Sequence, residues 1–318
     1  MERLDVFMAR ANALYYATQN PFADFTTAPE ITQVFGELLG AWAAIQWQAM
    51  GEPNPVLLVE AGPGRGTLMA DALRAAALIP AFHAALQVHF IETSPRLRAI
   101  QAAAVPRATW HSTLDAVPPG PIILFANEFL DALPIRQFVY RETWAERFVA
   151  NGAFIERPGP TLPPGQPGDV REQNDAAQAF ITAIATRVRH AGTALFLDYG
   201  PAHSAPGDSL QALRDGRPTN PLIDPGQADL TAHVDFAALA KTATTAGAAT
   251  HGPRAQGLFL ADLGLFQRTG RLAESQPPAR AAALIQSAQR LAEPGRMGRL
   301  FQALVVQAPS LPTPPGFT

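Results

Sequence analysis

Three glycines in the stretch VEAGPGRGT, residues 59–67, form the most specific chemical pattern in the sequence. Gly62, Gly64 and Gly66 permit a tight backbone turn and the close approach of a large ligand. The P-loop pattern requires a lysine directly after its last glycine, and the sequence has Thr67 there. The dinucleotide fingerprint requires a glycine at position 67, so Thr67 also weakens that interpretation. A tight turn that serves only the fold is the third alternative.

Acidic residues at the ends of two predicted strands favour a cationic nucleoside as the ligand. Glu60 stands in an E-x-G-x-G-x-G pattern, where a carboxylate repels a pyrophosphate but suits the amino group of S-adenosylmethionine. Glu92 ends the next predicted strand, where an acid can accept hydrogen bonds from both ribose hydroxyls. An NAD site would use the same acid, so Glu92 alone does not decide between the two. The glycine spacing together with Glu60 predicts S-adenosyl-L-methionine as the cofactor.

A second group of polar residues lies in the stretch ANEFLDALP, residues 126–134. Asn127, Glu128 and Asp131 come where a predicted strand gives way to a loop. In an open parallel sheet, the carboxyl ends of the strands form the ligand crevice. We therefore expect Glu128 and Asp131 to be catalytic groups that face the substrate, and Asn127 to bond the cofactor or the substrate. The alternative is that Glu128 and Asp131 cap the following turn.

Other polar residues are expected near the same edge of the sheet. Asp198 and Tyr199 end a later predicted strand, and Tyr199 either shapes a substrate channel or packs in the core. His233 precedes a helix for which Asp235 is the expected N-cap. The ordinary pKa of histidine lies near neutrality, so His233 is a candidate general base, with a structural role as the alternative. The seven histidines have no paired spacing and cysteine is absent, so no metal site is predicted.

The elements that position these residues alternate between strand and helix from about residue 55 onward. Apolar runs predict strands at 56–62, 87–93, 108–112, 122–129, 193–200 and 300–309. Helical patterns stand between the first of them. Such an alternation implies an α/β fold, a Rossmann-like parallel sheet with helices on both faces.

Three additions to this core are predicted. Residues 134–158 alternate with period two and contain Asn151-Gly152, which indicates a hairpin within an inserted β-meander. Thr27 and Glu30 have the spacing of a capping box and predict one helix through residue 50. Further helices are expected near 235–247, 256–268 and 277–292, after a long polar loop at 203–236.

These elements are predicted to form a single domain, residues 1–318. Its parts are an N-terminal loop and helix (1–54), a cofactor-binding core (55–200) and a substrate side (201–318).

Composition limits the partners. The 318 residues are 47% hydrophobic and 16% charged, with 24 Lys and Arg against 27 Asp and Glu. No block of like charge stands out, so a nucleic-acid partner bound through its phosphates is not expected. No stretch of eighteen apolar residues occurs, so we expect no membrane insertion. No apolar stripe can be assigned to an interface, which leaves a homodimer open.

Several long stretches together resemble the MidA-like family of class I S-adenosylmethionine-dependent methyltransferases. They are DFTTAPEITQVFGELLGAW, VEAGPGRGTLMADALR, IETSPRLR, ANEFLDALPIRQF, LFLDYG and DLTAHVDFAAL, and they lie between about residues 15 and 306. The family includes the mitochondrial complex I assembly-factor arginine methyltransferase. The resemblance implies a seven-stranded methyltransferase fold and a protein substrate. In the mitochondrial members, this substrate is the 49-kDa-type subunit of complex I.

The resemblance also suggests where the rest of the cofactor would lie. Thr93 is expected at the ribose, and Trp110 and His111 at the adenine, with core packing as the alternative for Trp110. Separately from the resemblance, the predicted capping box beside a polar loop places Thr26, Thr27 and Glu30 near the cofactor carboxylate, through the free amides of the helix start.

For an arginine acceptor, carboxylates would orient the guanidinium and help to accept its proton. A small-molecule O- or N-methyltransferase and an assembly factor without transfer activity are the alternatives. We expect a bacterial, cytoplasmic protein.

Overall fold

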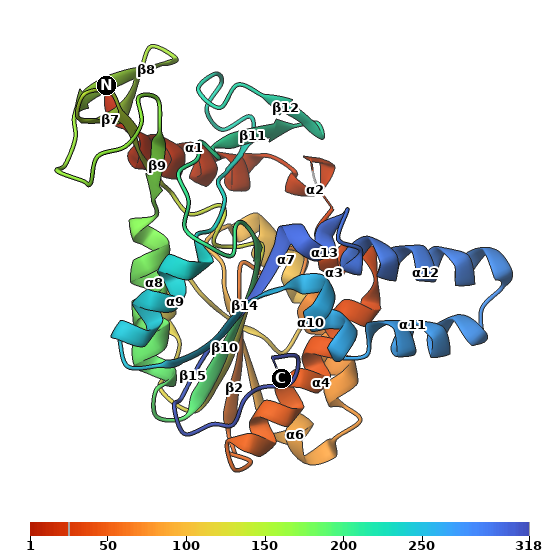
Figure 1. The fold of residues 1–318 in the computed structure, drawn as a ribbon. Helices are drawn as coiled ribbons and strands as arrows, with labels where there is room; N and C mark the ends of the chain where they lie inside the picture. Colours follow the sequence, from red (N-terminus) through yellow and green to blue (C-terminus); the bar gives the residue numbers. More distant parts are fainter. Residues whose placement is uncertain (25, 318) are drawn as a thin grey trace.

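A mixed seven-stranded sheet forms the centre of the molecule in the computed structural model, which describes residues 1–24 and 26–317 (Figure 1). In spatial order its strands are β14 (Ala249–Ala255), β15 (Phe301–Gln307), β10 (Gly192–Tyr199), β5 (Ile122–Asn127), β2 (Val56–Ala61), β3 (Leu86–Ile91) and β4 (Thr109–His111). Strand β15 runs antiparallel to both β14 and β10, and the other neighbouring strands are parallel to each other. The chain moves from β2 outward to β4 and then returns to β5, which makes the gap between β2 and β5 the switch point at which such sheets bind ligands.

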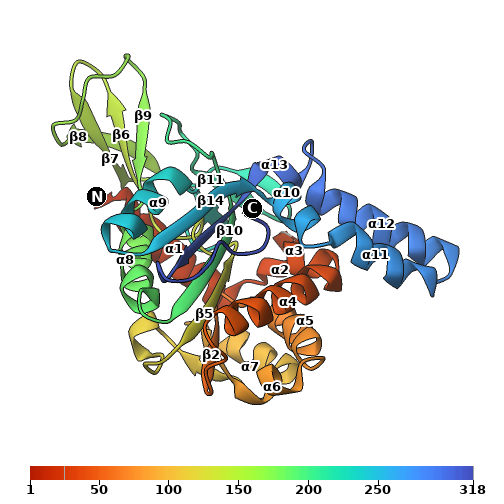
Figure 2. The ribbon, with the colours of Figure 1, turned by 60° about the horizontal axis from the view of Figure 1, so that its bottom comes forward.

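Helices cover both faces of this sheet, as the sequence predicted. One face packs on α4 (Gln33–Ala49), α5 (Thr67–Ala76), α6 (Pro80–Ala85) and α10 (Gln256–Asp262), and the other on α8 (Asp175–Val188) and α9 (Phe236–Thr245). Further short elements are α2 (Pro21–Asp24), α7 (Pro95–Ala104), α13 (Met297–Leu300) and a 3-10 turn at Leu114–Ala116. Helices α11 (Leu265–Glu274) and α12 (Pro278–Ala292) lie side by side and project from the body of the molecule (Figures 1 and 2).

The predicted strands are confirmed, and the predicted N-terminal helix is wrong in its start. A short helix, α3 (Ala28–Ile31), precedes α4, and extended Thr32 separates them at φ −159° and ψ 138°. The Thr32 hydroxyl, not Thr27, accepts the capping bond, from Val34 N at 3.3 Å. Glu30 instead accepts a hydrogen bond from the Thr67 hydroxyl at 2.5 Å, so no capping box forms.

The predicted meander is part of a larger second sheet. It holds β1 (Glu2–Arg3), β7 (Trp144–Ala150), β6 (Arg136–Tyr140), β9 (Val170–Gln173) and, at the side of β7, β8 (Ala153–Pro158). Asn151 and Gly152 both have positive φ, 52° and 70°, which confirms the predicted hairpin turn.

The polar segment 203–236 was expected to be a loop, and that prediction is wrong. It forms a small sheet of β11 (Gln211–Arg214), β12 (Arg217–Thr219) and β13 (Asp229–Thr231). Its strands are too short to show periodicity, although Asp215-Gly216 supplies a hairpin signal. Helix α1 (Leu4–Thr18) packs on β13, where Asn12 donates to Leu230 O at 2.8 Å and accepts from Leu230 N at 3.1 Å.

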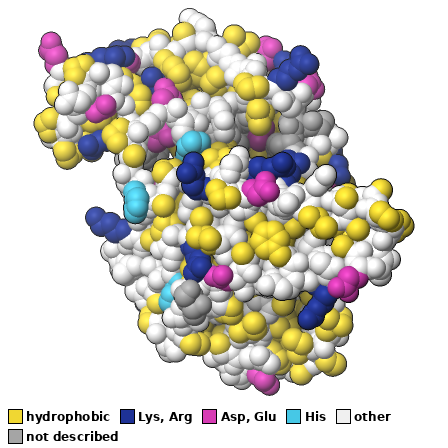
Figure 3. Space-filling view, turned by 45° about the vertical axis from the view of Figure 1, so that its right-hand side comes forward, with side chains coloured by type: hydrophobic (Ala, Val, Ile, Leu, Met, Phe, Trp, Pro, Cys, Tyr) yellow, Lys and Arg dark blue, Asp and Glu magenta, His cyan; other side chains and the backbone are white. Residues whose placement is uncertain are grey.

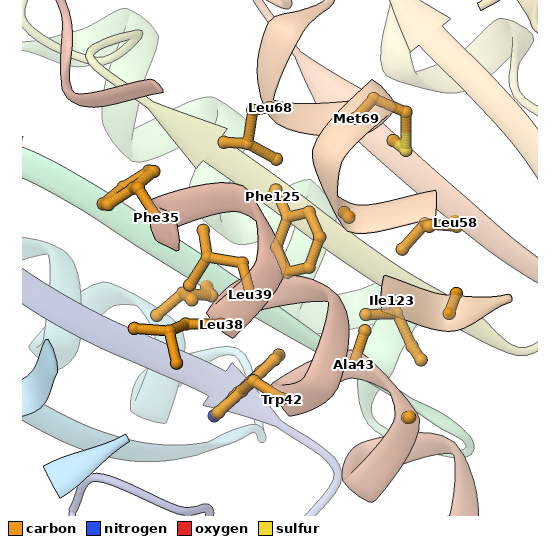
Figure 4. Close-up of a cluster of buried hydrophobic side chains, with 14 of the residues drawn as sticks. Phe35, Leu38, Leu39, Trp42, Ala43, Leu58, Leu68, Met69, Ile123 and Phe125 are labelled. Carbon is orange, nitrogen blue, oxygen red and sulfur yellow. The ribbon is translucent and has the colours of Figure 1, made fainter. Parts of the chain in front are cut away.

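Helix α4 lies so close to α5 that only glycine fits at two of its positions. Around this contact, apolar side chains of α4 meet those of β2, β5 and α5 (Figure 4). A Cβ atom on Gly40 would stand 2.4 Å from Ala72 O, and one on Gly36 would stand 2.6 Å from Asp71 Cβ. This contact fixes the position of α5, the helix that starts at the glycine turn.

We expect the Gly40→Ala variant to lose about 1–3 kcal/mol of unfolding free energy, because the two helices must separate. Gly270→Ala is the matched control, since a Cβ there meets nothing within 4 Å. Because Gly270 lies within helix α11, the Gly270→Ala variant should gain up to about 1 kcal/mol of unfolding free energy. Urea denaturation of both variants measures this, and equal midpoints would contradict the tight packing of α4 on α5.

Candidate functional site

The glycine turn lies at the carboxyl end of β2 and has the strained backbone that requires glycine. Gly62, Gly64 and Gly66 have φ values of 65°, 54° and 81°. A Cβ on Gly62 would stand 2.9 Å from the ring of Phe129. Gly66 forms the N-cap of α5. The turn therefore brings open backbone to the switch point of the sheet.

A cavity of about 460 Å³ lies beside this turn, and we call it the glycine-turn cavity. Its wall includes nine of the residues predicted from the sequence: Thr27, Glu30, Glu60, Gly62, Gly64, Glu92, Thr93, Asn127 and Glu128. Five other predicted residues do not line it: Gly66, Trp110, His111, Asp131 and His233. Helix α1 contributes Asn12 and Tyr16 to the same wall, a contribution that the sequence did not predict.

Glu60 is a buried carboxyl with one oxygen that lacks a hydrogen-bond partner among the described residues. Its side chain is 3% exposed, and its Oε2 has no hydrogen-bond partner among the described residues. Burial raises its pKa to about 8, although the Met69 backbone N–H opposes this by hydrogen bonding to the carboxylate. An ammonium group in the cavity would supply the missing charge, so Glu60 fits the amino group of S-adenosylmethionine.

Glu92 is held by a buried glutamine that the sequence gave no reason to choose. One oxygen of Glu92 accepts from Ser94 N at 2.7 Å and the other from Gln101 Nε2 at 3.1 Å. Gln101 also donates to Gly64 O at 2.9 Å, so it ties the predicted ribose acid to the glycine turn. A carboxylate has about four acceptor sites, which leaves Glu92 able to accept from ribose hydroxyls.

Trp110 and His111 do not line the glycine-turn cavity, and a ring nitrogen of each has a partner elsewhere. Trp110 donates to Gln101 Oε1 at 2.9 Å and its ring packs against Phe90, contacts that agree with the core packing given as the alternative. His111 Nε2 lies 3.0 Å from Nδ1 of buried His89. Ser112, the next residue, does line the cavity.

At the predicted anion site, one backbone amide of the helix start already has a side-chain partner. Helix α3 spans one turn, and its Ala28 N–H donates to Glu128 Oε1 at 2.9 Å. Thr27 makes no capping hydrogen bond with its side chain. Glu30 lies 3.5 Å from Arg65, whose guanidinium stands over the Phe22 ring at 4.2 Å. Thr27 and Glu30 thus line the cavity, while the amides of Ala28 and Glu30 are bonded to Glu128 and to Thr27 O.

Glu128 lines the cavity and has a strained backbone conformation. Its φ is 49°, unusual for a residue with a side chain. Its Oε1 accepts from Ala28 N and, at 3.1 Å, from Asn127 Nδ2. Burial is the main cause that raises its pKa to about 7. Asn127 Oδ1 is buried and has no partner among the described residues, so it is free to accept from a bound ligand.

Asp198 holds the turn that follows Glu128. Its Oδ2 accepts from three successive backbone amides, those of Phe129, Leu130 and Asp131, at 3.1, 2.8 and 3.2 Å. These amides have no strand partner, and Asp198 satisfies them together. The capping role considered for Glu128 and Asp131 in this turn therefore belongs to Asp198.

Asp131 and His233 are not brought into the glycine-turn cavity. Asp131 is 6% exposed, and burial, together with neighbouring Asp198 and Asp229, raises its pKa well above the ordinary value. His233 is exposed and its ring meets that of Tyr199 at 5.6 Å. It lines a different cavity, at the end of β10.

The sheet order, the glycine turn and the two acids define a class of protein that binds an adenosyl nucleoside at the switch point of a Rossmann-like sheet. Comparisons with known proteins place the chain more closely. Residues 38–254 match a family described as S-adenosyl-L-methionine-dependent methyltransferases, and the chain belongs to this family. It is a methyltransferase, and its cofactor is S-adenosyl-L-methionine.

Curated relatives and a solved structure agree with this assignment. The chain is 32% identical to the protein arginine methyltransferase NDUFAF7 homolog of Drosophila melanogaster, covering 94% of this chain and 79% of the relative. It is 32% identical to the human protein arginine methyltransferase NDUFAF7, covering 87% and 72%. A Burkholderia thailandensis protein bound to S-adenosyl-homocysteine is 25% identical with a TM-score of 0.82, covering 99% and 89%.

The expected bacterial, cytoplasmic location is wrong, because the curated relatives are named as mitochondrial proteins. That expectation relied on absent features, and absent features do not identify a compartment. Within the described part of the chain, no helix has the length and apolar character needed to cross a membrane. The same residues contain no group of three or more side chains suited to a metal ion.

Proposed function

We propose that this methyltransferase modifies an arginine side chain of a protein. The observation that carries the proposal is Glu128, a carboxyl that lines the cofactor's cavity at the end of β5. The names of the curated relatives support it, since they are called protein arginine methyltransferases. A guanidinium offers five N–H donors in a fixed fork, and carboxylates are its natural partners.

The residues of the cavity divide the work between cofactor and acceptor. Glu60 would hold the amino group of the cofactor, and Glu92 the ribose hydroxyls, while the glycine turn lets the nucleoside come close. S-adenosylmethionine, when bound, supplies an electrophilic methyl group on its sulfonium. Glu128 would orient the guanidinium nitrogen toward this methyl and take up the proton that the nitrogen loses. Its pKa of about 7 suits a group that both gains and loses a proton near neutrality.

The proposal includes two partners, a protein substrate and a second copy of the chain. A subunit of respiratory complex I is the protein substrate that the family resemblance suggests. A homodimer also remains a prediction, to be tested by the mass of the protein in solution.

The test is transfer of a labelled methyl group into a cell lysate, followed by mapping of the labelled residue by mass spectrometry. We expect label on an arginine of one or a few proteins, and less label at a limiting cofactor concentration with the Glu60→Gln variant as the matched control. Label confined to the small-molecule fraction would contradict the proposal. No incorporation with a protein that still binds the cofactor would indicate an assembly factor without transfer activity.

A further inference from the structure

A second cavity, of about 660 Å³, opens at the carboxyl end of β10, and none of the roles above uses it. We call it the His233 cavity. Its wall includes Glu172, Gly200, His233, Asp235, Arg296 and Arg299. Its volume is in the range of ligand sites, which span about 300–1,000 Å³. Arginine and histidine side chains lie across the middle of the face that Figure 3 shows.

The His233 cavity lies at the same edge of the sheet as the glycine-turn cavity, one strand further along. Strand β10, which ends at Tyr199, pairs in parallel with β5, and Leu197 stands opposite Asn127. Neighbouring strands are about 4.8 Å apart. The end of β10 is therefore within one side-chain length of Glu128.

Tyr199 and Asp131 stand between the two cavities. The Tyr199 ring meets the ring of His233, which lines the second cavity, and the Tyr199 side chain hydrogen-bonds to Asp131. Asp131 is followed by Ala132, which lines the first cavity. Asp131 Oδ1 is buried and has no hydrogen-bond partner among the described residues, so a carboxyl oxygen is left unpaired in this partition.

The wall of the His233 cavity carries both signs of charge as well as apolar residues. Glu172 already accepts from Gln137 at 2.7 Å and from Ser209 N at 3.0 Å, and Arg296 pairs with Glu293 at 3.0 Å. Pro201, Pro206 and Leu300 add apolar surface. Such a mixed wall suits a peptide segment, whose backbone both donates and accepts, better than it suits a simple anion or cation.

We propose that the His233 cavity receives the acceptor: a peptide segment whose arginine side chain extends past His233 and Tyr199 toward Asp131 and Glu128. This inference rests on the proposed function for the identity of the acceptor. The unpaired oxygen of Asp131 gives the guanidinium a first partner, and Glu128 gives the second at the methyl group. In this arrangement cofactor and acceptor enter through separate cavities, and Tyr199 and Asp131 lie between them.

Two glycines in the wall of the cavity have room for a Cβ atom, so a large side chain can be introduced at either position. Gly207 and Gly295 belong to different segments of its wall, and a Cβ on either one meets nothing within 4 Å. Gly270, on the exposed side of α11, has the same open surroundings and lies away from both cavities. We therefore compare Gly207→Trp and Gly295→Trp with Gly270→Trp as the matched control.

The first readout is the initial rate of labelled-methyl incorporation from a lysate, measured with S-adenosyl-homocysteine affinity as a check on the cofactor cavity. We expect both cavity variants to lower the rate at least tenfold, with cofactor affinity within twofold of the unmodified protein. Gly270→Trp should behave as the unmodified protein. Unchanged rates in both cavity variants would overturn the inference.

The second readout separates this inference from the proposed function. N-acetyl-arginine methylamide and its neutral citrulline analogue are titrated by NMR onto the protein saturated with S-adenosyl-homocysteine. Binding of the arginine compound alone, lost in both cavity variants, supports the inference, and binding that survives in them overturns it. If instead label enters small molecules and the cavity variants abolish that transfer, the cavity still holds the acceptor, while the proposed protein arginine is wrong.

Discussion

Replacing Glu60 with glutamine is expected to weaken binding of S-adenosylmethionine roughly 10- to 100-fold at pH 8, because a charged partner of the cofactor's ammonium is lost. Glutamine keeps the shape of the side chain and can still accept from Met69 N–H. Calorimetric titration of the cofactor measures the change. Glu146→Gln is the matched control, since Glu146 is a buried glutamate of β7, where it pairs with Arg136.

Cofactor binding through Glu60 should also depend on pH. The pKa of Glu60 is about 8 in the free protein, so the side chain is largely protonated at pH 6 and must lose its proton to pair with an ammonium. Affinity should therefore fall by about tenfold for each pH unit below 8. The Glu60→Gln variant should show no such slope. Equal slopes in the two proteins would remove Glu60 from the ammonium site.

Cofactor affinity should rise with pH, whereas the unfolding free energy of the ligand-free protein should fall with pH. The pKa of Glu60 lies above its ordinary value of 4.5, so the folded state retains a proton that the unfolded chain releases between pH 4.5 and 8. Unfolding free energy therefore falls as pH rises through this window. At pH 8 the cost is at most roughly 3–5 kcal/mol, and Glu60→Gln should recover part of it. Melting curves at pH 5 and pH 8 check this, because the variant should gain stability only at the higher pH.

The parts of the fold that sequence could predict are those in which burial leaves a continuous pattern. Strands β2 and β5 are buried along their whole length, so their apolar runs are plain in the sequence. Edge strand β14 has only partial burial and contains Gly252-Pro253, and both features remove the pattern that identifies a strand. The break at Thr32 was hidden because the apolar stripe continues on both sides of it.

The candidate site divides in the same way. Residues adjacent to a strand end, such as Glu60 and Glu128, could be predicted because a parallel sheet brings strand ends together. Gln101 could not be predicted from the sequence. Its role depends on hydrogen bonds with Gly64, Glu92 and Trp110 that only the folded chain creates. Asp131 and Asp198 look equivalent in the sequence. Only the folded chain shows that Asp198 caps the turn and that Asp131 is left with an unpaired oxygen.

The Glu128→Gln variant is expected to lower the rate of methyl transfer by at least about 100-fold, while cofactor affinity stays within about threefold. The glutamine oxygen can keep both hydrogen bonds that Glu128 Oε1 accepts, from Ala28 N and Asn127 Nδ2, so the backbone should not move. What is lost is the charge that orients a guanidinium and the ability to take up its proton.

The pH profile of transfer distinguishes this role from a structural one. With a pKa of about 7, Glu128 is increasingly ionised between pH 6 and 8, so the transfer rate of the unmodified protein should rise across that range. The small residual rate of Glu128→Gln should lack this rise. Transfer at the normal rate and with the normal profile would assign Glu128 to holding α3 through Ala28. A loss of cofactor affinity equal to the loss of rate would instead make it a cofactor ligand. Because the glutamine oxygen can keep both hydrogen bonds while the negative charge is lost, a large loss of rate at constant cofactor affinity would place the role of Glu128 on the acceptor side of the cavity.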